Sequence, residues 1–284
     1  MKRTILLLCA LLTAAYFSNA QTSSPRLIIR GDDMGYSHAG NEAILKCYKE
    51  GIEKSIEVLV PSPWFPEAVM MLTQIPDADI GIHLTLTSEW DNVKWRPLSD
   101  CPSLRDADGY FYPMVRPNKN YPKQSVVEND WKLADIEKEF RAQIELAMKK
   151  IPRISHFSGH MGCTTLNDDV IALVRKLAQE YHIKHYDTSL REAGVTYTSY
   201  VGAHATPEEK LMSFTKMLES LEPGKTYLFV DHPGLNTPEI QAIHHIGYEN
   251  VATDRQGVTD IWTNPRMKQL IKDKGIQLIG YSQL

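Results

Sequence analysis

Apolar, β-prone runs alternate with amphipathic stretches along most of the sequence. The first run, Leu27-Ile28-Ile29, has no polar alternation and therefore predicts a strand that is buried on both faces. Further strand signals occur at 56–60, 79–86, 154–158, 183–186, 226–230 and 276–281. Helical spacing and capping residues predict helices over 38–50, 66–75, 130–150, 168–181 and 207–221, a helical stretch from 238, and a last helix from 265.

The β-α-β-α order of these signals predicts an α/β fold. Such an order favours a parallel sheet, which can be open or closed into a barrel. About seven strands over roughly 260 residues fit one barrel-like domain better than two domains. We find no internal repeat and no clear linker, so we expect a single domain.

The segment 88–128 does not follow this rhythm. It is rich in proline and aromatic residues and has little periodicity. A segment of this length without its own elements usually covers a site or forms a surface excursion. Its aromatic residues suit a sugar face, but they could equally attach the segment to the body of the protein. Trp64, Trp90 and Trp95 could stack on a sugar, with ordinary packing as the default.

The first 20 residues predict a secretory signal peptide rather than part of the fold. Lys2 and Arg3 precede an apolar run, and the small residues Ser18-Asn19-Ala20 end it. A membrane anchor is the alternative, but the apolar run is shorter than a bilayer span. We therefore expect cleavage after Ala20, a mature domain over 21–284, and a secreted or periplasmic protein with no membrane contact after cleavage.

Charge and cysteine content restrict the partners. The formal net charge is −4 and no basic cluster occurs, which argues against nucleic acid as a partner. The mature chain keeps Cys47, Cys101 and Cys163, an odd number that does not form a disulfide framework, although one pair could form. The sequence leaves the oligomeric state open, including a homodimer.

Polar groups able to bind a metal follow four of the predicted strands. In a parallel barrel the carboxyl ends of all strands open on one face, so these groups should converge. Two imidazoles and one carboxylate leave coordination positions open, as a hydrolytic metal requires. Imidazole favours Zn²⁺, although Mg²⁺ or Mn²⁺ would suit the carboxylate. The candidate groups are Asp32, Asp33, His83, His160, Asp231 and His232.

The acidic pair alone could be a surface turn, because Asp and Gly are common in turns. Two adjacent carboxylates at a buried strand end repel each other unless a cation or a proton lies between them. If the strand continues through both residues, Asp32 and Asp33 point to opposite sides, and only one can face a metal. A loop that begins after Asp32 would relax this constraint.

Four short motifs follow one another at the predicted strand ends. They are Asp32-Asp33-Met34-Gly35, Gly81-Ile82-His83-Leu84, His156-Phe157-Ser158-Gly159-His160 and His232-Pro233-Gly234. Together and in this order they resemble the YdjC-like carbohydrate deacetylases, a family that includes chitooligosaccharide deacetylases. Two departures are visible. Met34 replaces a phenylalanine of the first motif, and Met161, Gly162 and Cys163 replace later histidines of the third, so substrate contacts should differ there.

The resemblance implies a distorted (β/α) barrel that removes N-acetyl groups from amino-sugar oligosaccharides with one divalent metal ion. Carried over, Asp33, His83 and His160 would be the metal ligands. Asp32 would be the general base toward water, and His232 would protonate the leaving amine or stabilise the oxyanion. A metal-dependent esterase or amidase on another acylated glycan and a non-catalytic glycan-binding protein remain the alternatives.

Other polar residues have weaker claims to the site. We expect His156 to be structural, since it lies inside its predicted strand. The pair His244-His245 suggests a helix surface, and His182 and His185 suggest solvated turns. Arg255 and Asp260 fall in a predicted late loop that could reach the site.

Overall fold

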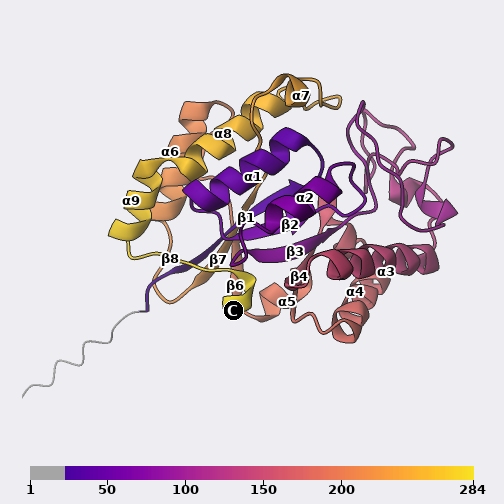
Figure 1. Cartoon of the computed structure of the whole chain (residues 1–284), viewed down its shortest axis with the longest axis horizontal. Helices are drawn as coiled ribbons and strands as arrows, with labels where there is room; N and C mark the ends of the chain where they lie inside the picture. Colours follow the sequence, from indigo (N-terminus) through magenta and orange to yellow (C-terminus); the bar gives the residue numbers. More distant parts are fainter. Residues whose placement is uncertain (1–22) are drawn as a thin grey trace, which may run out of the picture.

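The strand that opens the fold, β1 (Arg26–Met34), lies near the middle of a parallel sheet (Figure 1). The computed structural model describes residues 23–284, so the predicted signal peptide lies outside the described residues. Along the sheet the strands follow the order β5-β4-β3-β2-β1-β7-β6, and β8 also pairs with β1. The other strands are β2 (Ser55–Val58), β3 (Asp79–Leu84), β4 (Ile154–Gly159), β5 (His185–Tyr186), β6 (Val195–Thr198), β7 (Thr226–Asp231) and β8 (Gln277–Leu278).

All of the strand pairs in this sheet are parallel. Within residues 23–284, no pairing joins β5 to β6, so the curled sheet stays open on that side. The result is a half-barrel within one α/β domain, which confirms the predicted distorted barrel.

Helices connect the strands and cover the outer face of the sheet (Figure 1). Two of them begin at side-chain caps: Ser37 Oγ accepts from Gly40 N–H, and Asn167 Oδ1 accepts from Val170 N–H. The helices are α1 (His38–Glu50), α2 (Phe65–Leu72), α3 (Leu133–Lys150), α4 (Asp168–Glu180), α5 (Asp187–Glu192), α6 (Pro207–Glu219), α7 (Pro238–Gln241), α8 (Val251–Thr263) and α9 (Pro265–Asp273).

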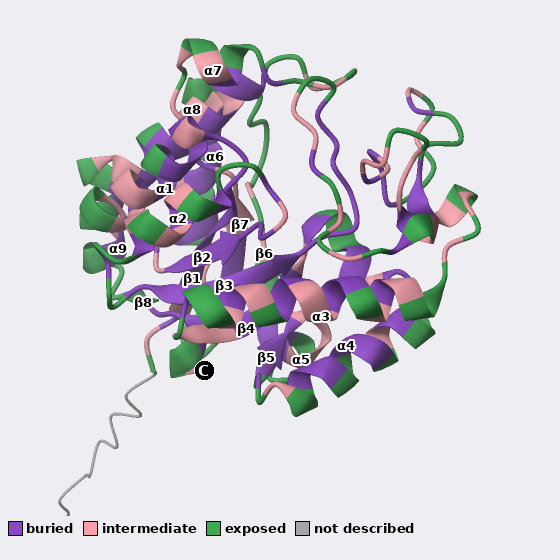
Figure 2. Cartoon of the chain, turned by 45° about the vertical axis from the view of Figure 1, so that its right-hand side comes forward, coloured by how far each residue is buried: buried purple, intermediate pink, exposed green. Residues whose placement is uncertain are grey.

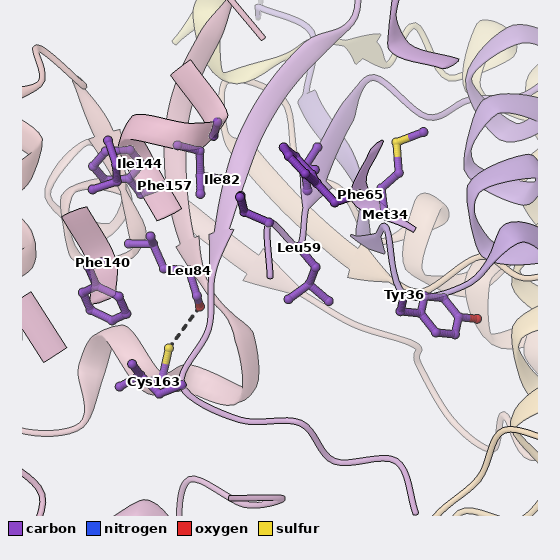
Figure 3. Packing of buried hydrophobic residues seen from close by; sticks show 14 of the residues in the cluster. Met34, Tyr36, Leu59, Phe65, Ile82, Leu84, Phe140, Ile144, Phe157 and Cys163 are labelled. Atoms are coloured by element: carbon purple, nitrogen blue, oxygen red, sulfur yellow. Dashed lines mark hydrogen bonds between the residues drawn. The ribbon is translucent and has the colours of Figure 1, made fainter. Parts of the chain in front are cut away.

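The two faces of the sheet differ in polarity. Residues paired in register share a face, and Gly81 pairs with His156 while His83 pairs with Ser158. The inner, concave face of the curled sheet therefore carries polar side chains. The outer face is apolar, and Figure 3 shows Ile82 and Phe157 with Phe140 and Ile144 of α3 in one buried cluster. Burial of this outer face against helices fixes the register and thus what points inward.

The segment 88–128 contains no α-helix or named strand, only two 3₁₀ turns at Pro102–Leu104 and Val126–Glu128. Figure 2 shows it as a set of long loops that extend beyond the sheet and α3. Trp90 and Trp95 are 1% and 3% exposed, so these aromatic residues pack into the body. Trp64, on the neighbouring loop before α2, is 39% exposed.

Some local expectations were wrong. The stretch between residues 186 and 207, for which the sequence pattern predicts no helix or strand, contains α5 and the edge strand β6. His244 and His245 lie on a loop rather than a helix, and His245 packs against Trp90 with ring centroids 5.6 Å apart. His185 is buried in β5, not solvated in a turn.

The three described cysteines, Cys47, Cys101 and Cys163, are buried and unpaired. Cys163 Sγ donates to the Leu84 carbonyl oxygen at 3.1 Å (Figure 3). No helix within residues 23–284 combines the length and apolar character needed to span a bilayer.

Candidate metal centre

Three buried side chains from β1, β3 and the end of β4 meet at the carboxyl edge of the sheet. One ligand atom from each of Asp33, His83 and His160 lies within 4.8 Å of the others. Asp33 Oδ1 is 3.2 Å from His160 Nδ1 and 3.6 Å from His83 Nε2. The three residues are 1–4% exposed, so this group could hold a metal ion away from bulk water.

The backbone at Asp33 explains how two neighbouring acids reach the same place. The strand does continue to Met34, but Asp33 adopts φ 71°, in the left-handed region that Asp tolerates better than most residues. The pairing of β1 with β2 shifts register between Gly31 and Met34. The alternation of side chains between the two faces of β1 therefore ends at Asp33. As a result His83 Nε2 lies near both acids, and its distance to Asp32 Oδ2 is 3.5 Å.

The donor set fits a divalent cation. Asp33 Oδ1 is buried and has no hydrogen-bond partner, although it faces the two imidazoles. Ligands about 2.0–2.2 Å from a tetrahedral ion lie roughly 3.3–3.6 Å from one another. The two distances to Asp33 Oδ1, 3.2 and 3.6 Å, match that spacing.

Each imidazole is oriented by a partner on its other nitrogen. His83 Nδ1 lies 2.7 Å from Ser158 Oγ, and His160 Nε2 lies 2.9 Å from Glu89 Oε2. Such partners fix the ring orientation and tautomer of metal-ligating histidines. Burial lowers the pKa of both imidazoles, but the carboxylates of Glu89 and Asp33 raise that of His160 to about 10. The carboxylates around this group therefore favour a positive charge at this position, as a bound cation would supply.

Asp32 is held by a buried arginine. Arg30 Nε and Nη2 donate to Asp32 Oδ1 and Oδ2 at 2.8 and 3.0 Å, and Arg30 Nη1 donates to Tyr281 Oη. Burial alone would lower the pKa of Arg30, but Asp32, Tyr281 and Glu57 raise it well above its usual value. The guanidinium therefore stays charged and fixes the Asp32 carboxylate beside His83.

His232 lies on the open side of the group. Its Nε2 is 3.8 Å from Asp33 Oδ2, and its Nδ1 is 3.6 Å from Asp231 Oδ1. Asp231 in turn accepts a hydrogen bond from Tyr200 Oη at 2.6 Å. Burial would lower the pKa of His232, but Asp33 and Asp231 outweigh it and raise that pKa. The side chain is 37% exposed, so a ligand could reach it.

Two further residues follow the sequence-based expectations only in part. Arg255 does reach the site, since its Nη2 donates to Asp33 Oδ2 at 2.9 Å, but it does so from helix α8. Asp260 is exposed on the same helix and accepts from Gln256. His156 is structural as expected: it lies 2.5 Å from Glu57 and stacks on the Tyr281 ring.

The sequence thus pointed to seven of the side chains that meet here, while Glu89, Arg30 and Ser158 were not assigned to the site. The seven are Asp32, Asp33, His83, His160, Asp231, His232 and Arg255. Arg30 and Asp32 share one strand face at an i, i+2 spacing, a signal that could have indicated the pairing. Ser158 pairs in register with His83, which the strand pattern alone does not reveal. Glu89 lies in the segment without periodicity and offered no such signal.

A family model described as YdjC-like protein matches residues 26–273, which is most of the chain. The chain belongs to the YdjC-like family. The matched range of this YdjC-like protein contains every strand end that contributes to the metal group.

Curated relatives support the same placement of the YdjC-like chain. It is 28% identical over 275 residues to an Enterococcus faecalis protein named carbohydrate deacetylase, an alignment that covers 92% of this chain and 99% of the relative. A Thermus thermophilus protein with the same name is 29% identical over 238 residues, which cover 76% of this chain and 80% of the relative.

A solved structure agrees with the fold. It is an Enterococcus faecalis protein named for a proposed role in cellobiose-phosphate cleavage. It superposes with a TM-score of 0.73 at 24% identity and covers 92% of this chain and 99% of its own. At this identity the similarity shows the architecture, and the function has to be argued from the site.

Proposed function

We propose that the protein is a metal-dependent hydrolase that removes N-acetyl groups from amino-sugar oligosaccharides. Homology supports a carbohydrate deacetylase, because relatives with that name align over most of the chain. The observation that carries the proposal is the buried group of Asp33, His83 and His160 beside two further titratable side chains, Asp32 and His232.

In this proposal Asp33, His83 and His160 hold one divalent metal ion. Two imidazoles favour Zn²⁺, and the carboxylate keeps Mg²⁺ or Mn²⁺ as alternatives. Such an ion would lower the pKa of water toward neutrality and polarise the acetyl carbonyl. The unpartnered Asp33 Oδ1 supports this assignment, because a buried carboxylate oxygen normally has a partner.

Asp32 is the proposed general base. It would take a proton from the water whose oxygen adds to the acetyl carbon, and Arg30 would keep its carboxylate aimed at that position. His232 is the proposed general acid. Its raised pKa keeps a proton available for the leaving amine when the C–N bond breaks and acetate departs. The Asp231 carboxylate would keep this imidazole in position.

We also place the mature protein outside the cytoplasm, in the secreted or periplasmic space. The support is the charged start, apolar run and small-residue end of residues 1–20. A substrate met there would be an extracellular or cell-envelope glycan fragment. Homodimer formation remains a separate expectation that a mass measurement in solution would decide.

Acetate release from N-acetylated and O-acetylated sugars tests the function. Metal-stripped protein reloaded with Zn²⁺, Mn²⁺ or Mg²⁺ should release acetate from N-acetyl sugars and generate free amine in equal amount. Release from O-acetyl sugars alone would make the protein an esterase. Binding of oligosaccharide without release under any metal would make it a glycan-binding protein.

Matched variants link that activity to the proposed ligands. His83→Ala and His160→Ala should each lose most bound metal as well as activity, since each leaves the coordination incomplete. His182→Ala, an exposed histidine in a turn, serves as the control and should keep both. Anomalous scattering from a crystal grown with zinc would show directly whether a cation lies among Asp33, His83 and His160.

A further inference from the structure

A cavity lined mostly by polar residues adjoins the metal group on the inner side of the sheet. Its volume is about 380 Å³, and it lies between the end of β4, helix α5 and the edge strand β6. Gly159 in its wall directly precedes His160, and Arg30 in its wall holds Asp32. We infer that this cavity binds a neighbouring sugar ring of the oligosaccharide, next to the ring whose acetyl group is removed. This inference rests on the proposed function.

The cavity offers both hydrogen-bonding groups and an aromatic face. Asp187 accepts from Thr164 through Oδ2, and no hydrogen bond in the described residues engages its Oδ1. Arg191 is exposed at the rim, and within residues 23–284 its guanidinium forms no ion pair or hydrogen bond. Tyr197 is 43% exposed, although it faces the inner side of the curl, opposite Leu228 in register. An acceptor, a donor and a ring face suit the hydroxyls and C–H groups of a pyranose.

The charges around the cavity favour a neutral ring over an anionic one. The Arg30 guanidinium is already compensated by Asp32 at 2.8 Å and lies 3.7 Å from Glu57. The Asp187 carboxyl and the Arg191 guanidinium stand in the same wall, so their charges oppose each other. An occupant with its own negative charge would meet the carboxyl group of Asp187, and a like charge there is costly.

The position of the cavity also leaves room for a longer chain. Asp187 follows β5 directly, and Tyr197 belongs to β6. These are the two ends of the sheet order, between which no strand pairing closes the barrel in residues 23–284. About 380 Å³ lies near the lower end of volumes for small-molecule sites, enough for a sugar ring. Further sugar rings of a longer oligosaccharide could extend out of the cavity through the open side of the sheet, between β5 and β6.

The test compares a disaccharide with a monosaccharide in the zinc-loaded full-length protein. The probes are N,N'-diacetylchitobiose and N-acetylglucosamine, and the readout is the ratio of their kcat/KM values for acetate release. Tyr197→Ala and Arg191→Ala should each lower this ratio about five- to tenfold, the scale of one lost ring contact or charged hydrogen bond. Tyr197→Phe, which keeps the ring, should stay close to the unchanged protein.

Arg266→Ala removes an exposed arginine on the distant helix α9 and is the matched control. An unchanged ratio in both Tyr197→Ala and Arg191→Ala, with unfolding temperatures preserved, would overturn the inference. A second arm measures calorimetric binding of two disaccharides to the metal-free protein, the uncharged N,N'-diacetylchitobiose and one that contains a uronic acid. Tighter binding of the uronate, lost in Arg191→Ala, would also overturn the assignment to a neutral ring.

The same binding arm separates this inference from the proposed function. Disaccharide binding that depends on Tyr197, without acetate release under any metal, would refute the deacetylase and keep the subsite. Acetate release with equal efficiency on both probes in every variant would keep the deacetylase and refute the subsite.

Discussion

Glu89 is the residue that the site needs and the sequence pattern did not indicate. Its carboxylate lies 2.9 Å from His160 Nε2 and is buried. We expect Glu89→Gln to weaken metal binding about 10- to 100-fold, the usual range for loss of a carboxylate behind a ligating histidine. Titration of zinc against a competing chelator measures this.

Asp91 provides the control for Glu89 because it lies on the same segment and its carboxylate accepts from Tyr121 Oη instead. Asp91→Asn should leave the zinc affinity unchanged. Equal affinities in Glu89→Gln and the unchanged protein would mean that Glu89 does not support the ligand. That result would leave His160 to be oriented by Asp33 alone.

The two neighbouring acids should respond differently to the same change. Asp32→Asn should keep the metal and lose about two or more orders of magnitude in turnover, the scale for loss of a general base. Asp33→Asn should weaken metal binding itself, and excess metal should partly restore its rate. Metal content and turnover of both variants, measured side by side, decide the assignment. Metal loss in Asp32→Asn with retention in Asp33→Asn would reverse the two roles.

The site residues that sequence reasoning did find share one property. Asp32, Asp33, His83 and His232 stand at or just beyond the ends of apolar strands, where parallel topology requires convergence. Which of these side chains contact one another could not be predicted, because the contacts depend on the strand register and on the left-handed backbone at Asp33. The sequence therefore predicts which strand ends form the site, whereas the contacts between the side chains follow only from the fold.

At the scale of elements, helix α3 anchors the long segment 88–128. The buried Glu139 carboxylate accepts from the N–H groups of Leu98 and Ser99 and from Gln143 Nε2. We expect Glu139→Ala to lower the free energy of unfolding by about 1–3 kcal/mol, because it leaves buried donors without an acceptor. Urea denaturation followed by circular dichroism measures the change.

Glu137 lies on the same helix and pairs with Arg141 and Lys176 near the surface. Glu137→Ala is the matched control and should cost less than about 1 kcal/mol, as surface ion pairs contribute little. If both variants lose the same free energy, helix propensity rather than anchoring of the segment accounts for the effect.

Elements with strong periodicity were predictable, and short ones were not. The helix α3 and the strands β3 and β4 begin within a few residues of their predicted positions. In contrast, α5 has six residues and β6 has four, too few for a helical or alternating pattern to stand out. Both form where the open side of the sheet requires cover, which is a tertiary effect.

At the scale of the whole molecule, export is the first expectation to check. N-terminal sequencing of material from the medium or periplasm should begin at Gln21 or within a few residues of it. A mature chain that retains Met1 and sediments with membranes would mean an anchored protein. A chain that retains Met1 in the cytosolic fraction would contradict export altogether.

The stability of the whole domain should depend on a carboxyl group beneath β1. Glu53 is fully buried and neither of its oxygens has a partner. Burial, and then the charge of Asp32, raise its pKa well above the usual value. A raised carboxyl pKa stabilises the fold fully below about pH 4, and this contribution is lost as pH rises toward the raised pKa.

A neutral side chain at position 53 does not ionise, so it avoids the loss of stability that Glu53 causes as pH rises. The gain in unfolding free energy from Glu53→Gln should therefore be larger at pH 8 than at pH 5. Denaturant titrations at the two pH values measure the difference, with Glu50→Gln at the exposed end of α1 as the control. A gain of the same size at both values would show that Glu53 does not titrate with folding.

The same glutamate restricts what can stand opposite it on β1. A Cβ atom built at Gly31 would collide with Glu53 Oε1, so a larger residue at 31 requires the buried Glu53 carboxyl to move. A shorter side chain at 53 removes that collision. Among homologues, or in a randomised library selected for folding, a larger residue at 31 should appear together with a shorter one at 53. A chain that carries only the first of these changes should be rarer among the survivors than one that carries both.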